Sequence, residues 1–114
     1  MKIQIIRNKI SKEEIAQLAK ESFGEMVKAV VDIKKGILAV GGEMHADAEL
    51  ELLDDGSKQG DLWGINLYPN QEKNQWVEFS SLINIRPSIG NRSMNVEDRS
   101  IQEKITNIVN KLVG

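Results

Sequence analysis

Hydrophobic and polar positions along the chain predict two amphipathic helices. Ser11 and Glu14 fit a capping box, and apolar residues then recur at helical spacing as far as Gly24, so we expect a helix over 12–22. A single apolar stripe near the end of the chain predicts a second helix over 97–112, with the stripe buried. The stripe consists of Ile101, Ile105, Ile108, Val109 and Leu112.

Short apolar runs rich in β-branched residues predict strands. They lie at residues 2–6, 26–33, 37–40, 62–68 and 76–86. The connection 34–36 is short and ends in glycine, which favours a β-hairpin between the second and third runs. Pro87 ends the last run, because proline has no N–H to donate to a sheet ladder.

Residues 44–53 carry two conflicting signals. Their content of alanine, glutamate and leucine favours a helix by propensity. From His45 to Leu52, however, polar and apolar residues alternate without a break, which is the period of a strand. We give the alternation more weight and expect a strand. One side would then carry Ala46, Ala48, Leu50 and Leu52, and the other His45, Asp47, Glu49 and Glu51.

The expected order of elements is β-α-β-β-β-β-β-α, in one α+β domain over residues 1–114. Consecutive strands with short connections favour a mostly antiparallel sheet of about five or six strands. Each helix has one apolar face, so we expect a two-layer sandwich with both helices packed on one face of the sheet. The opposite face would be open to water, a ligand or a second subunit.

The composition narrows the classes of function. The chain has 114 residues and no cysteine, which excludes disulfides, thiol catalysis and zinc sites built on thiolates. It has neither a signal-peptide pattern nor an apolar run long enough to cross a membrane. The net charge of −2 offers no general attraction for nucleic acid or anionic lipid. We expect a soluble cytoplasmic protein with no nucleic-acid or membrane partner.

The first candidate site is the polar side of residues 43–49. On a strand, His45, Asp47 and Glu49 would share one face, and an imidazole with carboxylates suits a divalent metal or proton transfer. Neighbouring residues on that face are too far apart to chelate one ion alone. The alternative interpretation is that these are the polar residues any solvent-facing strand must carry.

The second candidate is the arginine-bearing stretch 84–93. Arg86 and Arg92, near the turn residues Gly90 and Asn91, suit a carboxylate or a phosphate. The alternative is that both arginines pair with acidic residues and hold the loop against the sheet. If the strand register is as expected, the two candidates meet on one face. The combined set is His45, Asp47, Glu49, Asn66, Asn84, Arg86, Asn91 and Arg92.

Three phrases of the sequence resemble a known family. They are Gly-Gly-Glu-Met-His-Ala-Asp-Ala-Glu at 41–49, Asp-Gly-Ser-Lys-Gln-Gly-Asp-Leu-Trp-Gly-Ile-Asn at 55–66, and Ser-Leu-Ile-Asn-Ile-Arg-Pro-Ser-Ile-Gly-Asn-Arg-Ser at 81–93. The chain is similar over nearly its whole length to a family of short prokaryotic proteins known as a domain of unknown function. The resemblance implies a small stand-alone protein and no particular activity.

Two classes of function remain open at this point. The first is a ligand-binding or protein-interaction module that uses the polar sheet face, either for a small polar or anionic ligand or for a homodimer through Val30 and Leu82. The alternative is a small metal- or acid/base-dependent enzyme with His45, Asp47 and Glu49 near Arg86 and Arg92. The sequence assigns no catalytic residue, metal or cofactor. We prefer the binding module.

Overall fold

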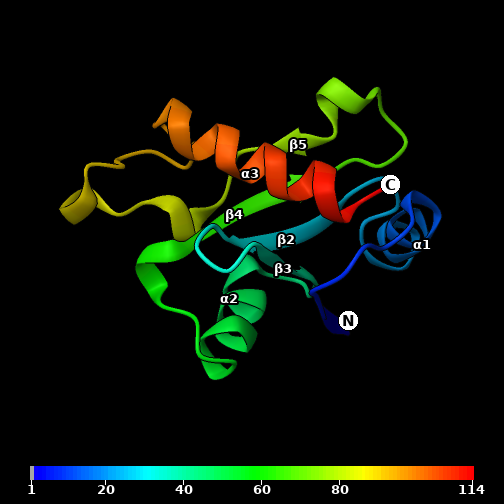
Figure 1. The fold of residues 1–114 in the computed structure, drawn as a ribbon, viewed down its shortest axis with the longest axis horizontal. Coiled ribbons are helices and arrows are strands. Elements are labelled where there is room, and N and C mark those ends of the chain that lie inside the picture. The colour runs from blue at the N-terminus through cyan, green and yellow to red at the C-terminus, as the bar shows by residue number, and fades with distance from the viewer. Residues whose placement is uncertain (1) are drawn as a thin grey trace.

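The computed structural model describes residues 2–114 and shows a five-stranded sheet with helices on both of its faces (Figure 1). Neighbouring strands are antiparallel, in the order β1-β3-β2-β4-β5, so the predicted α+β class and antiparallel sheet are confirmed. None of the helices in this part of the chain is long and apolar enough to cross a membrane. The strands are β1 (Ile3–Ile6), β2 (Val27–Asp32), β3 (Ile37–Gly41), β4 (Leu62–Leu67) and β5 (Val77–Glu78), and the α-helices are α1 (Lys12–Ser22), α2 (His45–Asp54) and α3 (Arg99–Leu112).

Helices α1 and α3 contribute to the larger core, on one face of the sheet. The predicted N-cap of α1 is confirmed, because Ser11 Oγ accepts a hydrogen bond from the Glu14 N–H at 3.1 Å. The apolar stripe of α3 is buried at Ile105, Val109 and Leu112. Alternate residues of β2 and β4 face the same core. They are Val27, Ala29 and Val31 from β2, and Trp63, Ile65 and Leu67 from β4.

Strands β2 and β3 form the predicted hairpin, and its turn is anchored by a buried carboxylate. Asp32 is 1% exposed, and its Oδ1 accepts hydrogen bonds from the N–H groups of Lys34 and Lys35, both at 2.9 Å. Its Oδ2 accepts a hydrogen bond from Ser57 Oγ at 2.7 Å. Because Ser57 follows α2, this carboxylate also ties the end of that helix to the hairpin.

The segment for which we expected a strand at 44–53 is helix α2, so that prediction is wrong. Gly41 and Gly42 precede the helix with φ angles of 116° and 86°, which end β3 and redirect the chain. At the first turn, Asp47 Oδ2 accepts a hydrogen bond from the Met44 N–H at 3.3 Å. Helical propensity is therefore supported by a break before the segment and by a cap at its start, and the alternation has no structural role.

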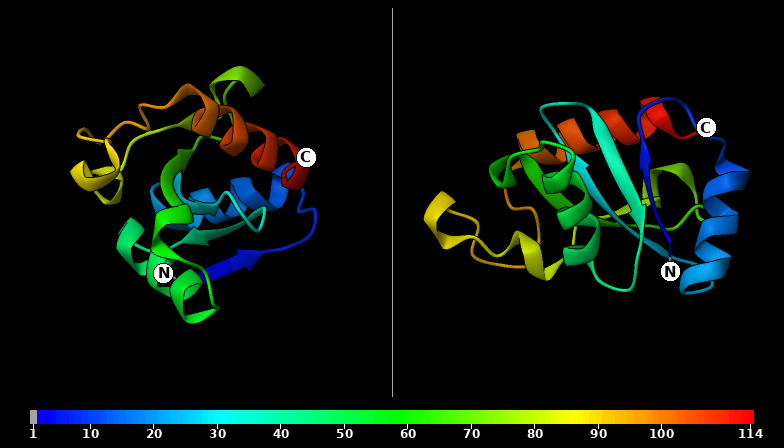
Figure 2. Two further views of the ribbon diagram at one scale, coloured as in Figure 1. Left: turned by 60° about the vertical axis from the view of Figure 1, so that its left-hand side comes forward. Right: turned by 90° about the horizontal axis from the view of Figure 1, so that it is seen from below.

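Helix α2 covers the face of the sheet that we expected to stay open, and it adds a third layer (Figure 2). Its buried Ala48 and Leu52 pack with Val30, Ala39 and Leu62 in a second, smaller core. The order of elements is therefore β-α-β-β-α-β-β-α. The surface available on this side is the part of the sheet that α2 leaves uncovered.

The long strand predicted over 76–86 is also wrong, because β5 ends at Glu78. The chain then crosses β4 at residues 80–84, the crossing segment, which includes the 3-10 turn Leu82–Asn84. The second 3-10 turn, Pro87–Ile89, lies in an arm that stands away from the body (Figure 2). The Asn84 carboxamide replaces the missing strand. Its Oδ1 accepts a hydrogen bond from the Gly64 N–H at 2.8 Å, and its Nδ2 donates to the Gly64 carbonyl at 3.0 Å. One side chain thus satisfies the backbone of β4 where a strand would pair.

Candidate functional site: a methionine-lined pocket

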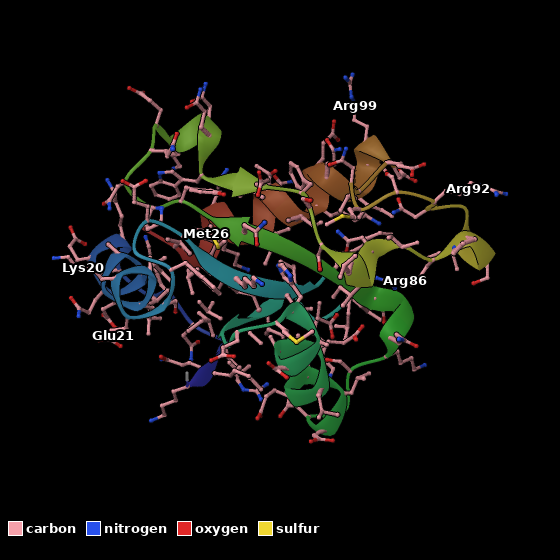
Figure 3. All side chains as sticks on the ribbon, turned by 180° about the vertical axis from the view of Figure 1, so that it is seen from behind. Lys20, Glu21, Met26, Arg86, Arg92 and Arg99 are labelled. Carbon is pink, nitrogen blue, oxygen red and sulfur yellow. The ribbon has the colours of Figure 1, made fainter. Side chains whose placement is uncertain are left out.

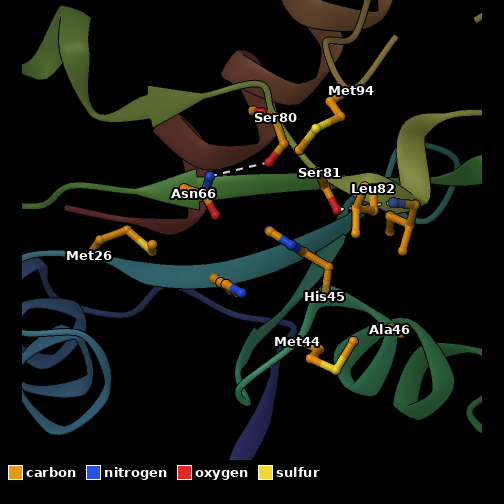
Figure 4. A pocket seen from close by; sticks show the side chains of 11 residues that line it. Met26, Met44, His45, Ala46, Asn66, Ser80, Ser81, Leu82 and Met94 are labelled. Atoms are coloured by element: carbon orange, nitrogen blue, oxygen red, sulfur yellow. Dashed lines mark hydrogen bonds between the residues drawn. The ribbon is translucent and has the colours of Figure 1, made fainter. Parts of the chain in front are cut away.

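A pocket of about 280 Å³ lies on the α2 side of the sheet, where the helix leaves β2 and β4 uncovered (Figure 4). Its walls come from the start of α2 and the residue before it, from β2 and the residue before it, from β4, and from residues 80–83 of the crossing segment, with one residue from the loop before α3. The lining residues are Met26, Lys28, Met44, His45, Ala46, Asn66, Ser80, Ser81, Leu82, Ile83 and Met94. Two residues of the predicted site, His45 and Asn66, are therefore brought together here.

His45 is the first residue of α2 and is 8% exposed. Its Nε2 lies 2.8 Å from the Ile65 carbonyl, to which it donates when it carries the proton. Burial is the main cause that lowers the pKa of His45, and the charge of Lys28 lowers it further. The Ile65 carbonyl, Asn66 and Glu78 raise that pKa without reversing the shift. The ring is therefore neutral at neutral pH, with one N–H committed to the backbone.

Asn66 lies beside His45 on the pocket floor and is 7% exposed. Its Nδ2 donates to Glu78 Oε1 at 2.7 Å and to the Ser80 carbonyl at 3.2 Å, which fixes the orientation of the carboxamide. Its Oδ1 is buried and has no hydrogen-bond partner within residues 2–114. Buried acceptors normally have a partner, so this oxygen is an unsatisfied acceptor beneath the pocket floor.

The upper walls of the pocket are apolar and partly exposed. Met44, Leu82 and Met94 are 57%, 68% and 42% exposed, which is unusual for large apolar side chains that lie close together. All three methionines within residues 2–114 line this pocket. Methionine is unbranched and polarizable, so such a wall adapts to the shape of what it contacts.

A close contact between β4 and the crossing segment positions one wall of the pocket. A Cβ atom added to Gly64 would lie 2.4 Å from Ser81 Cβ and 2.6 Å from Ser81 Oγ, so only glycine allows this approach. The Ile83 N–H donates to Ser81 Oγ at 3.2 Å and caps the turn that follows. The absence of a side chain at Gly64 therefore lets Ser81, Leu82 and Ile83 lie across the sheet.

Arg86 is held by the backbone and by Trp63, and it does not line the pocket. Its guanidinium donates to three carbonyl groups, those of Gln59, Leu62 and Ile83, and stacks 4.5 Å from the centre of the Trp63 ring. Burial lowers the pKa of Arg86, and nearby Glu49 raises it. These contacts join the start of β4 to the crossing segment.

The other residues of the predicted site lie apart from the pocket. Glu49 is on the face of α2 that carries His45, one turn further on, and its Oε2 is buried without a partner in the described part of the chain. Asp47 is exposed and caps α2. Asn91 Nδ2 contacts the carbonyls of Asn84, Ser93 and Asn95, and so organises the arm. Arg92 is exposed and projects from that arm (Figure 3).

The expected row of His45, Asp47 and Glu49 on one face is therefore not formed. Within residues 2–114, no group of three or more histidine and acidic side chains is placed to hold a metal ion. The sequence patterns did not indicate Met26, Lys28, Met44 and Met94 as site residues, because the three methionines follow no period and Lys28 is an ordinary polar position of a predicted strand. The one signal in the sequence is that Met26 and Met44 stand directly before β2 and α2. That signal is too weak to indicate a site.

The comparisons with known proteins agree with the resemblance noted in the sequence. The model of a family described as "Protein of unknown function (DUF5674)" matches residues 4–112. The chain belongs to this family. No curated protein and no solved structure gives a significant match. Membership in DUF5674 therefore confirms the predicted family and assigns no activity.

Proposed function

We propose that this DUF5674 protein is a binding module that takes a small molecule into the pocket between α2, β4 and the crossing segment. The observation that carries the proposal is the composition of that pocket. Three methionines, a leucine and an isoleucine surround a floor made by His45 and Asn66. Small-molecule sites commonly combine an apolar lining with a few placed polar groups, and this pocket has both.

The state of the polar groups supports binding over acid/base catalysis. The one imidazole is neutral, and its Nε2 is committed to the Ile65 carbonyl. Asp47, which would have shared its face on a strand, is exposed on the helix surface. A cytoplasmic location is part of the same proposal and is supported by the absence of cysteine, which suits a reducing compartment.

The test is a thermal-shift screen of small organic molecules with two matched variants on α2. Ala46 is exposed and lines the pocket, so Ala46→Trp fills its mouth. Leu50 is 57% exposed on the same helix and does not line the pocket, so Leu50→Trp is the control. A ligand of the pocket should raise the melting temperature of the wild type and of Leu50→Trp, because binding to the folded state stabilises it by mass action.

The same compounds should have little effect on Ala46→Trp. Compounds that stabilise all three proteins equally would show that binding occurs elsewhere and would contradict the proposal. A screen in which no compound stabilises the wild type would contradict it as well.

A further inference from the structure

The charge of the pocket comes from one lysine. Of the eleven lining residues, Lys28 is the only one with a charged side chain at neutral pH, since His45 is neutral. Lys28 Nζ donates to the Glu43 carbonyl at 2.8 Å and lies 5.1 Å from the centre of the Phe23 ring. An ammonium group has three N–H donors, so two of them are free of side-chain or backbone partners within residues 2–114. The pocket thus offers donors and a positive charge to a bound molecule.

The size and lining of the pocket define the rest of the ligand. A volume of about 280 Å³ is at or below the lower end of small-molecule sites, so the ligand is smaller than a typical drug molecule. The wall of methionine, leucine and isoleucine favours a ligand with an apolar body. Because methionine side chains adapt to what they contact, the wall does not require one particular ligand shape.

From these observations we infer that the pocket binds a small carboxylate with an apolar body, its carboxylate beside Lys28 and its body between the methionines. This inference rests on the proposed function and specifies the class of ligand. A cation in the same place would be repelled by Lys28, and a neutral molecule could accept its hydrogen bonds but would not neutralise its charge.

The acidic groups nearby leave this charge preference in place. Glu78 Oε1 accepts hydrogen bonds from Asn66 Nδ2 at 2.7 Å and from the Tyr68 hydroxyl at 3.3 Å, so its carboxylate is already occupied by neutral donors. Glu78 is exposed and does not line the pocket. Glu43 is exposed and contacts Lys28 through its backbone carbonyl, leaving the ammonium without a carboxylate partner in the described chain.

The structure provides a built-in reporter of an anion in this place. His45 is the only histidine of the chain, so its ring gives a single set of imidazole signals in an NMR spectrum. The charged groups that act on this ring are Lys28 and Glu78. A carboxylate bound beside Lys28 adds a negative charge near the ring and favours its protonated form. The titration midpoint of His45 should therefore rise when the pocket fills with an anion.

The experiment compares octanoate with octan-1-ol, which has the same carbon chain and no charge. We expect octanoate to bind about tenfold more tightly, because its carboxylate forms an ion pair with the Lys28 ammonium, whereas the hydroxyl of octan-1-ol is a neutral acceptor. Octanoate should raise the titration midpoint of His45, and octan-1-ol should not. Within a series from butanoate to octanoate, affinity should rise about fourfold for each methylene that enters the apolar wall.

Two variants with the same change in net charge locate the effect. Lys28→Gln removes the pocket charge and should lower octanoate affinity about tenfold, to the level of octan-1-ol. Lys20→Gln removes an exposed lysine on α1 and should leave octanoate affinity unchanged.

Equal affinity for octanoate and octan-1-ol, with no change in Lys28→Gln, would overturn the inference. The proposed function would still stand if Ala46→Trp abolished binding of both. Absence of binding by either compound would overturn the inference alone, and the proposed function would then depend on the wider screen.

Discussion

At the scale of single residues, His45 illustrates how tertiary surroundings set a charge state. An exposed histidine has a pKa of about 6.5 and is partly protonated at neutral pH. Burial at the start of α2, together with Lys28, lowers the pKa of His45 in the folded protein. The imidazole is therefore a neutral polar group in the pocket floor.

This shift predicts how stability depends on pH. Between the lowered pKa of the folded state and about 6.5, the unfolded chain binds a proton at His45 that the folded protein does not. The free energy of unfolding should therefore fall as pH decreases through 6.5, by less than about 1.4 kcal/mol per pH unit, and this loss should level off below the folded pKa.

Urea unfolding of the wild type and of His45→Gln between pH 8 and pH 5 measures the effect. The difference in unfolding free energy between the two proteins should change across this range in the direction that favours the variant at low pH. A difference that stays constant with pH would contradict the prediction.

The role of Arg86 is likewise decided by its tertiary surroundings. From the sequence, an arginine beside a turn suits either an anion or a structural contact, and both interpretations are open. The structure places its guanidinium on three carbonyl groups and on the Trp63 ring. Those contacts hold the crossing segment against β4. Arg86 therefore affects the pocket only by positioning the wall that this segment forms.

At the scale of elements, the crossing segment is the part that builds the pocket. β5 pairs with β4 only at Asn66 and Leu67. Beyond that point, Asn84 binds the backbone of Gly64, and Ser81 lies on the bare glycine. A full-length β5 would instead continue along the edge of β4, and Leu82 and Ile83 would not lie across the sheet beside α2.

The contact at Gly64 predicts a strong effect of a single methyl group. Gly64→Ala places a Cβ atom 2.4 Å from Ser81 Cβ, so the crossing segment must shift. We expect the variant to lose about 1–3 kcal/mol of unfolding free energy, as overpacked cores do. Because Ser81 lines the pocket, ligand binding should weaken in the same variant.

Gly60→Ala is the matched control, since a Cβ atom at that position has no neighbour within 4 Å and its φ angle is not positive. Chemical denaturation of both variants gives the comparison. Equal stability of Gly64→Ala and the wild type would show that the crossing segment is not packed as described.

At the scale of the whole molecule, α2 changes which surface is available to partners. The homodimer expected from the sequence relied on an open sheet face with Val30 and Leu82. Val30 is fully buried under α2, whereas Leu82 is 68% exposed at the pocket rim with Met44 and Met94. Self-association stays a prediction, and this rim is the apolar surface that it would use.

Sedimentation velocity over a range of micromolar concentrations tests that prediction. We expect a concentration-dependent dimer in the wild type and a monomer in Leu82→Asp, because a charge in an apolar contact costs more than it gains. A wild-type monomer at every concentration would refute self-association. A dimer that persists in Leu82→Asp would place the contact elsewhere.

The sequence by itself determined the elements whose signals are local. The Ser11 cap and the stripe of α3 specify their helices, and the alternation of β2 and β4 specifies which residues face the larger core. The sequence also determines the family, because the family model matches residues 4–112 directly. These features need no knowledge of distant contacts.

The tertiary structure decided what local signals leave open. Residues 44–53 combine the composition of a helix with the period of a strand, and the turn at Gly41 and Gly42 with the core on Val30 selects the helix. β5 ends at Glu78 although the sequence pattern favours a longer strand, and the Asn84 carboxamide takes the place of that strand at Gly64, twenty residues earlier in the chain. The pocket results from both choices, and its residues come from five separate segments. A pattern along the chain contains no information on contacts between such distant segments, because those contacts depend on how the layers pack.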